Sequence, residues 1–346
     1  METIQETPDA LVENGRIHTG FFKTPFRRVN LLDASAPGRF LGKPFRRLRL
    51  KEWVGFGICH PQLYGGVLIQ NARYAASAVF YLYDRETQTK AEWLLVDLPM
   101  RVPLPETLWA SECACGGSSR KGRILFQHDL THFRHHVHAD IPSSGGRPAL
   151  FADLVFHQDW RHVQPLVVSL PIPPHHHTYT HKSPLRIEGR IRIGEAEYCF
   201  EPSRDMGNLD EQKTYYPYRS QWHWGCFGAR TGAGHEVMIN LVDQMTEKGK
   251  PGEDALWVNG ELMLLEPAQF IPEAQEGGYR LEDKTGRIKL RFKAEGAKME
   301  QRNYLVVAIN YRQYFGAYSG EIVDNNGHTH VIENAFGALE RMRARF

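Results

Sequence analysis

The chain has 346 residues, 42% of them hydrophobic and 24% charged, and its formal net charge at pH 7 is +2. This composition is typical of a folded globular protein. Because the charges nearly balance, no broad basic field exists to attract a nucleic-acid backbone, and nucleic acid is not an expected partner.

The chain also lacks the usual marks of secretion or membrane insertion. The first residues, "METIQETPDALVENG", are acidic and polar rather than basic and then apolar, unlike a secretory signal. No apolar run approaches the roughly 18 residues that a membrane helix needs. Five cysteines spread over the chain do not form a disulfide framework. We therefore expect a cytoplasmic protein without a transmembrane segment.

Period-two alternation dominates the chain from its first half onward. "AASAVFYLYD" (75–84), the turn "RETQT" and "KAEWLLVD" (90–97) predict a β-hairpin. In "RIEGRIRI" (186–193), Ile187 and Ile191 fall on one face of a strand and the arginines fall on the other. "RIKLRFK" (287–293) repeats this pattern. Many short strands with polar turns indicate a β-sandwich or β-barrel.

The stretch "VQPLVVSLPIPPHHHTYTHKSP" (163–184) is rich in proline and histidine and is interpreted as the link between two halves. We therefore predict one domain over 15–168 and a second over 169–346. The segments 52–71 and 223–240 resemble each other, since each has a tryptophan, a Phe-Gly pair, a loop and a strand ending in asparagine. Such internal similarity favours two similar halves, but it also occurs by chance between two hairpins.

Histidine is enriched in two clusters. Within "HDLTHFRHHVHAD" (128–140), His132, His136 and His138 would share a strand face with Arg134, which indicates a solvated face rather than a metal site. No glycine-rich nucleotide loop opens a helix. The sequence therefore predicts neither a cofactor nor a metal, and it leaves the oligomeric state open.

"RSQWHWGCFG" (219–228) predicts a strand with Trp222, Trp224 and Cys226 on one face, and the next strand places Asn240 beside Met238. Both tryptophans then point the same way. Such a face is either a packed core or the lining of a cavity for an apolar ligand with one polar handle. The final run "NAFGALERMRARF" (334–346) predicts a short C-terminal helix.

Several segments carry a resemblance to a known family. They are "GFFKTPFRRVN", "LKEWVGFGICHPQLYGGVLIQNARYAASAVFYLYDRET", the long block "EGRIRIGEAEYCFEPSRDMGNLDEQKTYYPYRSQWHWGCFGARTGAGHEVMINLVDQ" and "YRQYFGAYSGEI". Over nearly its whole length the chain resembles DUF2804, a bacterial family of unknown function. The resemblance implies a distant similarity to tandem lipocalin-like proteins, which include carotenoid hydratases and tocopherol cyclase. The implied fold is all-β, with two consecutive antiparallel barrels or strongly bent sheets.

With this resemblance the pocket interpretation is favoured over the packed core. The implied function is binding of a hydrophobic small molecule, an acyl lipid or an isoprenoid, in a barrel cavity. The expected ligand-binding residues are Trp53, Tyr215, Tyr218, Arg219, Trp222, Trp224 and Asn240. The tyrosines would orient a polar group and the arginine would hold a carboxylate.

Two alternatives remain open. The first is a cofactor-independent hydratase, isomerase or cyclase in which a buried aspartate donates a proton. The chain lacks the Arg-Gly pair of the family pattern, so both Asp205 and Asp210 fit the acidic position. A buried carboxyl with a raised pKa beside the two tryptophans would favour the enzyme, and a dry cavity would favour a binding protein. The second alternative is a β-sandwich that binds or acts on carbohydrate, since tryptophans also stack on sugars.

Overall fold

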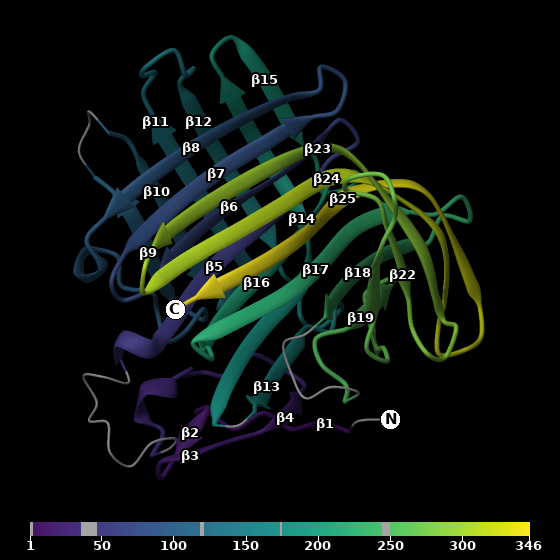
Figure 1. Ribbon diagram of the computed structural model, residues 1–346, viewed down its shortest axis with the longest axis horizontal. Helices are drawn as coiled ribbons and strands as arrows, with labels where there is room; N and C mark the ends of the chain where they lie inside the picture. The colour runs from purple at the N-terminus through teal and green to yellow at the C-terminus, as the bar shows by residue number, and fades with distance from the viewer. Residues whose placement is uncertain (1–2, 36–46, 118–120, 174, 244–249) are drawn as a thin grey trace.

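The protein is almost entirely β-structure, arranged as two large sheets that pack against each other (Figure 1). The computed structural model describes residues 3–35, 47–117, 121–173, 175–243 and 250–346. In these ranges, no helix is long and apolar enough to cross a membrane. The predicted all-β class is confirmed.

The first sheet contains 14 strands within the described ranges, and its main path is antiparallel throughout. That path curls until β8 contacts β9, which makes a nearly closed barrel (Figure 1). In spatial order its strands are β8 (Thr89–Asp97), β7 (Ala76–Asp84), β6 (Leu63–Asn71), β5 (Leu50–Cys59), β16 (Met206–Tyr215), β14 (His176–Ile193), β12 (Leu150–His157), β11 (Arg134–Ile141), β10 (Arg123–Asp129) and β9 (Ser111–Gly116). Its other strands are β1 (Ile4–Gln5), β4 (Gly20–Phe22), β13 (Leu166–Ile172) and β15 (Ala196–Phe200).

The second sheet has nine strands in the described ranges and curls into a half-barrel (Figure 1). In spatial order they are β20 (Glu261–Leu264), β19 (Ala255–Val258), β18 (Glu236–Asp243), β17 (Arg219–Arg230), β25 (Thr329–Arg345), β24 (Val307–Val323), β23 (Ile288–Tyr304), β22 (Tyr279–Glu282) and β21 (Gln269–Pro272). Outside the two sheets lie a small ribbon of β2 (Val12–Glu13) and β3 (Arg16–Ile17) and the 3₁₀ turns η1 (Leu31–Asp33), η2 (Pro99–Arg101) and η3 (Leu130–His132).

Alternating side chains fill the inside of each sheet. Phe56, Phe126 and Phe156 pack at the centre of the first barrel. Phe227 and Leu339 belong to a separate core on the inner face of the half-barrel. Both interiors are thus apolar cores at these positions, as expected when one strand face is turned from water.

A third apolar cluster joins the two sheets, and we call it the intersheet interface. The outer wall of the barrel supplies Tyr64 and Tyr83, and the second sheet supplies Phe315 and Phe336. The rings of Tyr83 and Phe315 stack with centroids 5.3 Å apart. The Tyr83 hydroxyl also donates a hydrogen bond to the Glu295 carbonyl over 3.0 Å. The outer face of one barrel wall is therefore a buried face in this protein.

The two sheets repeat one topology. β5 to β8 form a meander whose first strand pairs with β16, and β17 to β20 form a meander whose first strand pairs with β25. The two similar sequence segments, 52–71 and 223–240, form the first hairpin of each meander. They occupy corresponding places in the two sheets.

Local strand predictions agree with the structure. β7 and β8 form the predicted hairpin, and β14 and β15 form another around Gly194. Ile187 and Ile191 are fully buried, as the alternation in β14 requires.

Two predicted elements are wrong. The expected C-terminal helix is the end of β25, because this segment lies between β17 and β24 and hydrogen-bonds to both. Such tertiary pairing overrides local helix propensity. The expected link at 163–184 contains β13 and part of β14, which pair with each other. The change from the first sheet to the second falls after Tyr215, later than the predicted domain division at 168/169.

Candidate functional site

β17 places Trp222 and Trp224 on one strand face, as the alternation predicted. That face points to the intersheet interface, where Trp224 packs against the apolar cluster. The opposite face carries Phe227 into the core of the half-barrel. The tryptophans therefore lie between the two sheets rather than inside either barrel, because the half-barrel interior is occupied by its own core.

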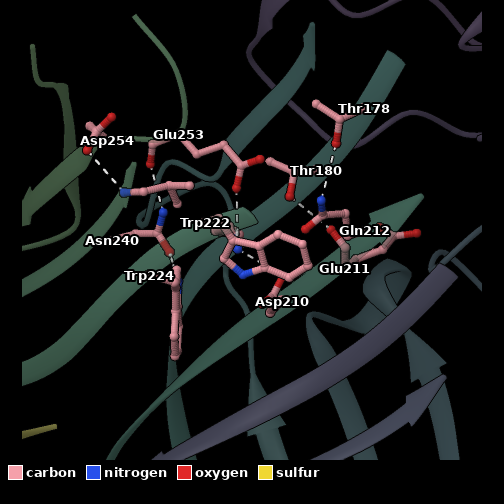
Figure 2. A network of polar contacts seen from close by, with 12 residues as sticks. Thr178, Thr180, Asp210, Glu211, Gln212, Trp222, Trp224, Asn240, Glu253 and Asp254 are labelled. Carbon is pink, nitrogen blue, oxygen red and sulfur yellow. Dashed lines mark hydrogen bonds and ion pairs between the residues drawn. The ribbon is translucent and has the colours of Figure 1, made fainter. Parts of the chain in front are cut away.

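Both indole nitrogens have defined partners. Trp224 Nε1 donates to Asn240 Oδ1 over 2.8 Å, and Asn240 Nδ2 donates to the Glu253 carbonyl over 2.7 Å (Figure 2). Trp222 Nε1 donates to Glu340 Oε1 over 2.7 Å. These bonds fix the orientation of both rings and bring two glutamates beside them.

Lys182 links the barrel wall to these groups. Its Nζ lies 2.9 Å from Asp210 Oδ1 and 3.5 Å from Glu253 Oε2. The same ammonium lies 5.9 Å from the centroid of the Trp224 ring. Burial alone would lower the pKa of Lys182, but the carboxylates of Asp210 and Glu253 outweigh it and raise that pKa. Lys182 is therefore a fixed cation at the interface.

We call the residues joined by these contacts the polar cluster; its members are Lys182, Asp210, Trp222, Trp224, Asn240, Glu253 and Glu340. Burial raises the pKa of Glu253, which Lys182 partly opposes. Burial also raises the pKa of Glu340, against the hydrogen bonds from Trp222 and Tyr311. The nearby Asp210 carboxylate raises both values further. Three carboxyl groups close to one ammonium favour retention of a proton on a glutamate.

Two buried oxygens near the cluster have no hydrogen-bond partner in the described part of the chain. They are Oε1 of Glu253 and Oε1 of Gln313. Gln313 on β24 lies directly across from Glu340 on β25. Thr180 lies beside the Glu253 carboxyl and Tyr81 lies beside the Gln313 amide. A buried acceptor without a donor is costly, so each unpartnered oxygen can accept a hydrogen bond from a bound group that carries an O–H or N–H.

An aromatic stack connects the two sheets at the edge of the cluster. The Tyr216 ring lies between Trp53 of β5 and Trp222 of β17, with centroid distances of 6.2 and 5.4 Å. The Tyr216 hydroxyl accepts a hydrogen bond from Gln212 over 2.9 Å. Trp53 is thereby brought to the site from the first sheet, as part of one aromatic wall.

Four predicted site residues lie elsewhere. Asp205 accepts hydrogen bonds from the Glu201 backbone and from Arg204, closing the turn before β16. The Tyr215 side chain packs in a separate apolar cluster of the N-terminal segment. Tyr218 is exposed and donates to the Val306 carbonyl. Arg219 lies at an open hollow of the half-barrel.

Sequence reasoning missed several members of the site. Lys182 lies in the segment that was expected to be a link, and Glu340 lies in the segment that was expected to be a helix. Tyr216 was passed over for its neighbours, because the end of β16 decides which tyrosine faces the second sheet. The alternation of Ala338, Glu340 and Met342 in β25 was the available signal for Glu340.

The histidine-rich strands divide as alternation requires. His136 and His138 face outward and lie beside Asp153. His128 and His135, by contrast, are buried in the barrel. Among the described residues, no group of three or more His, Cys, Asp or Glu side chains is arranged to hold a metal ion.

The sequence matches the family model for the domain of unknown function DUF2804 over residues 1–346. The chain belongs to the DUF2804 family. The resemblance inferred from its motifs is thus confirmed. A sequence search of curated proteins finds no match to this DUF2804 chain.

Two solved structures resemble the DUF2804 fold. A candidate AttH protein from Nitrosomonas europaea has a TM-score of 0.51 at 12% identity, over 88% of this chain and 97% of that chain. Kievitone hydratase from Nectria haematococca has a TM-score of 0.46 at 10% identity, over 86% of this chain and 88% of that chain. The first of these supports a shared fold for the DUF2804 chain, and nothing finer.

Proposed function

We propose that the protein binds a small, mainly apolar molecule with a hydroxyl group at the intersheet interface and transfers a proton to it without a cofactor, using Glu340 as the donor. An isoprenoid or an acyl lipid fits this description. The observation that carries the proposal is the Glu340 carboxyl, which has a raised pKa and is held by the Trp222 indole.

The side chains at the interface indicate the class of ligand. Trp53, Trp222 and Trp224 bring aromatic side chains to the interface, with Tyr216 stacked between the first two, and such a lining favours an apolar ligand body. The unpartnered oxygens of Glu253 and Gln313 accept hydrogen bonds, which favours a donor such as a hydroxyl group. A site with this many ionisable groups is more typical of proton transfer than of simple storage.

Glu340 suits the donor role better than its neighbours. Asp210 is engaged by the Lys182 ammonium, whereas Glu340 makes no ion pair in the described part of the chain. In the proposed step the Glu340 proton adds to one carbon of a ligand double bond, and the bond's electron pair forms the new C–H bond. The aromatic faces stabilise the resulting cation. Water, an internal nucleophile or loss of another proton then quenches it, and the last proton released returns to Glu340.

Native mass spectrometry of protein purified without detergent from its own host, with solvent extraction, tests whether a ligand occupies the site. Farnesol and monooleoylglycerol, which both carry a hydroxyl group, are then titrated against intrinsic fluorescence. We expect Trp224→Phe to weaken binding of the preferred probe at least tenfold. Trp93→Phe, in the separate core of the first barrel, should bind like the wild type. Equal binding by Trp224→Phe and the wild type would place the ligand elsewhere.

The variant Glu340→Gln separates the enzyme from a binding protein. Glutamine keeps an acceptor for the Trp222 indole but holds no transferable proton. For the proposed enzyme, this variant still binds the extracted ligand and no longer converts it. Conversion at the wild-type rate would remove Glu340 from the donor role.

A further inference from the structure

The inner face of the half-barrel changes character along its strands. On β17 this face passes from Phe227 through His223 to Arg219, and on β25 it passes from Leu339 to Arg343. The apolar core therefore ends part-way along these strands, and basic side chains follow it toward the end where β17 begins and β25 finishes. These two strand ends lie side by side (Figure 1).

An open hollow of about 550 Å³ lies on this basic surface. Four arginines line it, together with amide side chains, and its described lining contains no aspartate or glutamate: Arg219, Arg302, Arg343, Arg345, Gln221, Gln301, Asn303 and Asn310. We call these residues the arginine hollow. Since the whole chain carries a net charge of only +2, the hollow is a local concentration of positive charge.

Two of the four guanidinium groups are free to bind a ligand. Arg302 pairs with Glu300 over 2.8 Å, and Arg345 donates to Asn303 Oδ1 over 2.7 Å. Arg219 and Arg343 make no side-chain hydrogen bond or ion pair with any described residue. Unpaired guanidinium groups present planar pairs of N–H donors that match the oxygens of a phosphate or carboxylate.

We propose that the arginine hollow binds a small ligand through a phosphate monoester or diphosphate group. Several arginines around one hollow suit a group with at least two negative charges and many acceptor oxygens, which phosphates supply and a single carboxylate does not. The amides of Gln221 and Asn310 add donors around it. Arg219, Gln221 and Arg343 lie on the face of β17 and β25 opposite Trp222 and Glu340, so the proposed phosphate site does not depend on the function proposed above.

Isothermal titration of the full chain with inorganic pyrophosphate, inorganic phosphate and succinate at low salt tests the proposal. We expect saturable binding of pyrophosphate or phosphate, and a Kd at least tenfold higher in Arg219→Gln and in Arg343→Gln. Arg192→Gln, an exposed arginine of the first barrel, is the charge-matched control and should change the Kd less than twofold. Arg219 and Arg343 are exposed, and circular dichroism verifies that both variants fold.

Three results would overturn the assignment. One is the absence of phosphate and pyrophosphate binding at low salt. Another is an equal loss of affinity in Arg192→Gln, which would indicate general charge attraction. The third is succinate binding as tight as that of pyrophosphate, which would make the hollow a carboxylate site.

Discussion

Glu340 lies in the middle of β25, between Trp224 on β17 and Gln313 on β24. Its carboxyl faces the barrel wall and accepts a hydrogen bond from the Trp222 indole. Because burial disfavours the charged form, the pKa of Glu340 is raised. The raised pKa that suits Glu340 to donate a proton also means that the ionised carboxylate destabilises the folded state.

Because only the ionised form destabilises the fold, the effect of Glu340→Gln on stability depends on pH. A carboxyl whose pKa is raised on folding favours the folded state below its unfolded pKa, and this contribution is lost as the pH rises through the folded value. Glutamine does not ionise. Relative to wild type, the variant should therefore gain free energy of unfolding between pH 5 and pH 8, by about 1.4 kcal/mol per unit of raised pKa.

Urea denaturation of both proteins at the two pH values measures this gain. An effect of Glu340→Gln that is the same at pH 5 and pH 8 would mean that the Glu340 pKa does not differ between the folded and unfolded states.

At the scale of single strands, period-two alternation predicted which side chains share a strand face, but it did not predict what that face contacts. The shared face of Trp222 and Trp224 and the buried isoleucines of β14 follow directly from period two. Alternation alone does not say which strand face meets a second sheet, so the place of Trp222 between the sheets was not predictable. β25 was mistaken for a helix because both of its faces are partly buried, which removes a clean period-two pattern.

Four strands of the barrel, together with Gln158 directly after β12, also hold a buried row of hydrogen-bonded polar side chains. His128 Nδ1 lies 3.0 Å from His135 Nδ1, and His135 Nε2 lies 2.9 Å from Gln158 Oε1. Gln158 Nε2 donates to His181 Nε2 over 2.8 Å, and His181 Nδ1 lies 3.3 Å from Glu211 Oε2. Since the amide donates only through nitrogen, one consistent set of tautomers runs from His128 to Glu211 with the first two histidines neutral.

The row of buried side chains from His128 to Glu211 predicts that acid lowers the stability of the fold. Burial lowers the pKa of His135 to about 4, and burial also lowers that of His128. A histidine with a lowered folded pKa contributes stability above its unfolded value of 6.5, and this stability is lost as the pH falls toward the folded value. His135→Gln should therefore reduce the stability lost between pH 7 and pH 5 by about 2 kcal/mol.

Urea midpoints at the two pH values test this expectation. Phe126→Leu, beside His128 in the same core, is the matched control and should lower stability equally at both. An unchanged acid dependence in His135→Gln would show that this residue is not held neutral.

At the scale of the whole molecule, the intersheet interface holds the two sheets together as one structure. Phe315 is fully buried there and contacts Tyr64, Tyr81 and Tyr83 of the barrel wall. A contact this extensive couples the unfolding of the barrel to that of the half-barrel. The polar cluster lies at the same interface, so its geometry depends on both sheets being folded.

We therefore expect a single unfolding transition, seen at the same urea concentration by circular dichroism and by tryptophan fluorescence. Phe315→Ala should lower the free energy of unfolding by about 3 to 5 kcal/mol, because it leaves a cavity in a packed aromatic cluster. Val331→Ala, a half-exposed position on β25, should change it by less than about 0.5 kcal/mol. Separate transitions in the wild type would show that the sheets unfold independently.

The pairing of β5 with β16 also determines when the barrel is completed during synthesis. β5 ends at Cys59 and its partner β16 begins at Met206, so about 150 residues separate them. At roughly 5 to 20 residues per second, the ribosome needs roughly 7 to 30 s to make this stretch. Throughout that time one edge of β5 is unpaired, and an unpaired edge invites association with other chains. We therefore expect the nascent chain to bind chaperones that cover strand edges until β16 emerges.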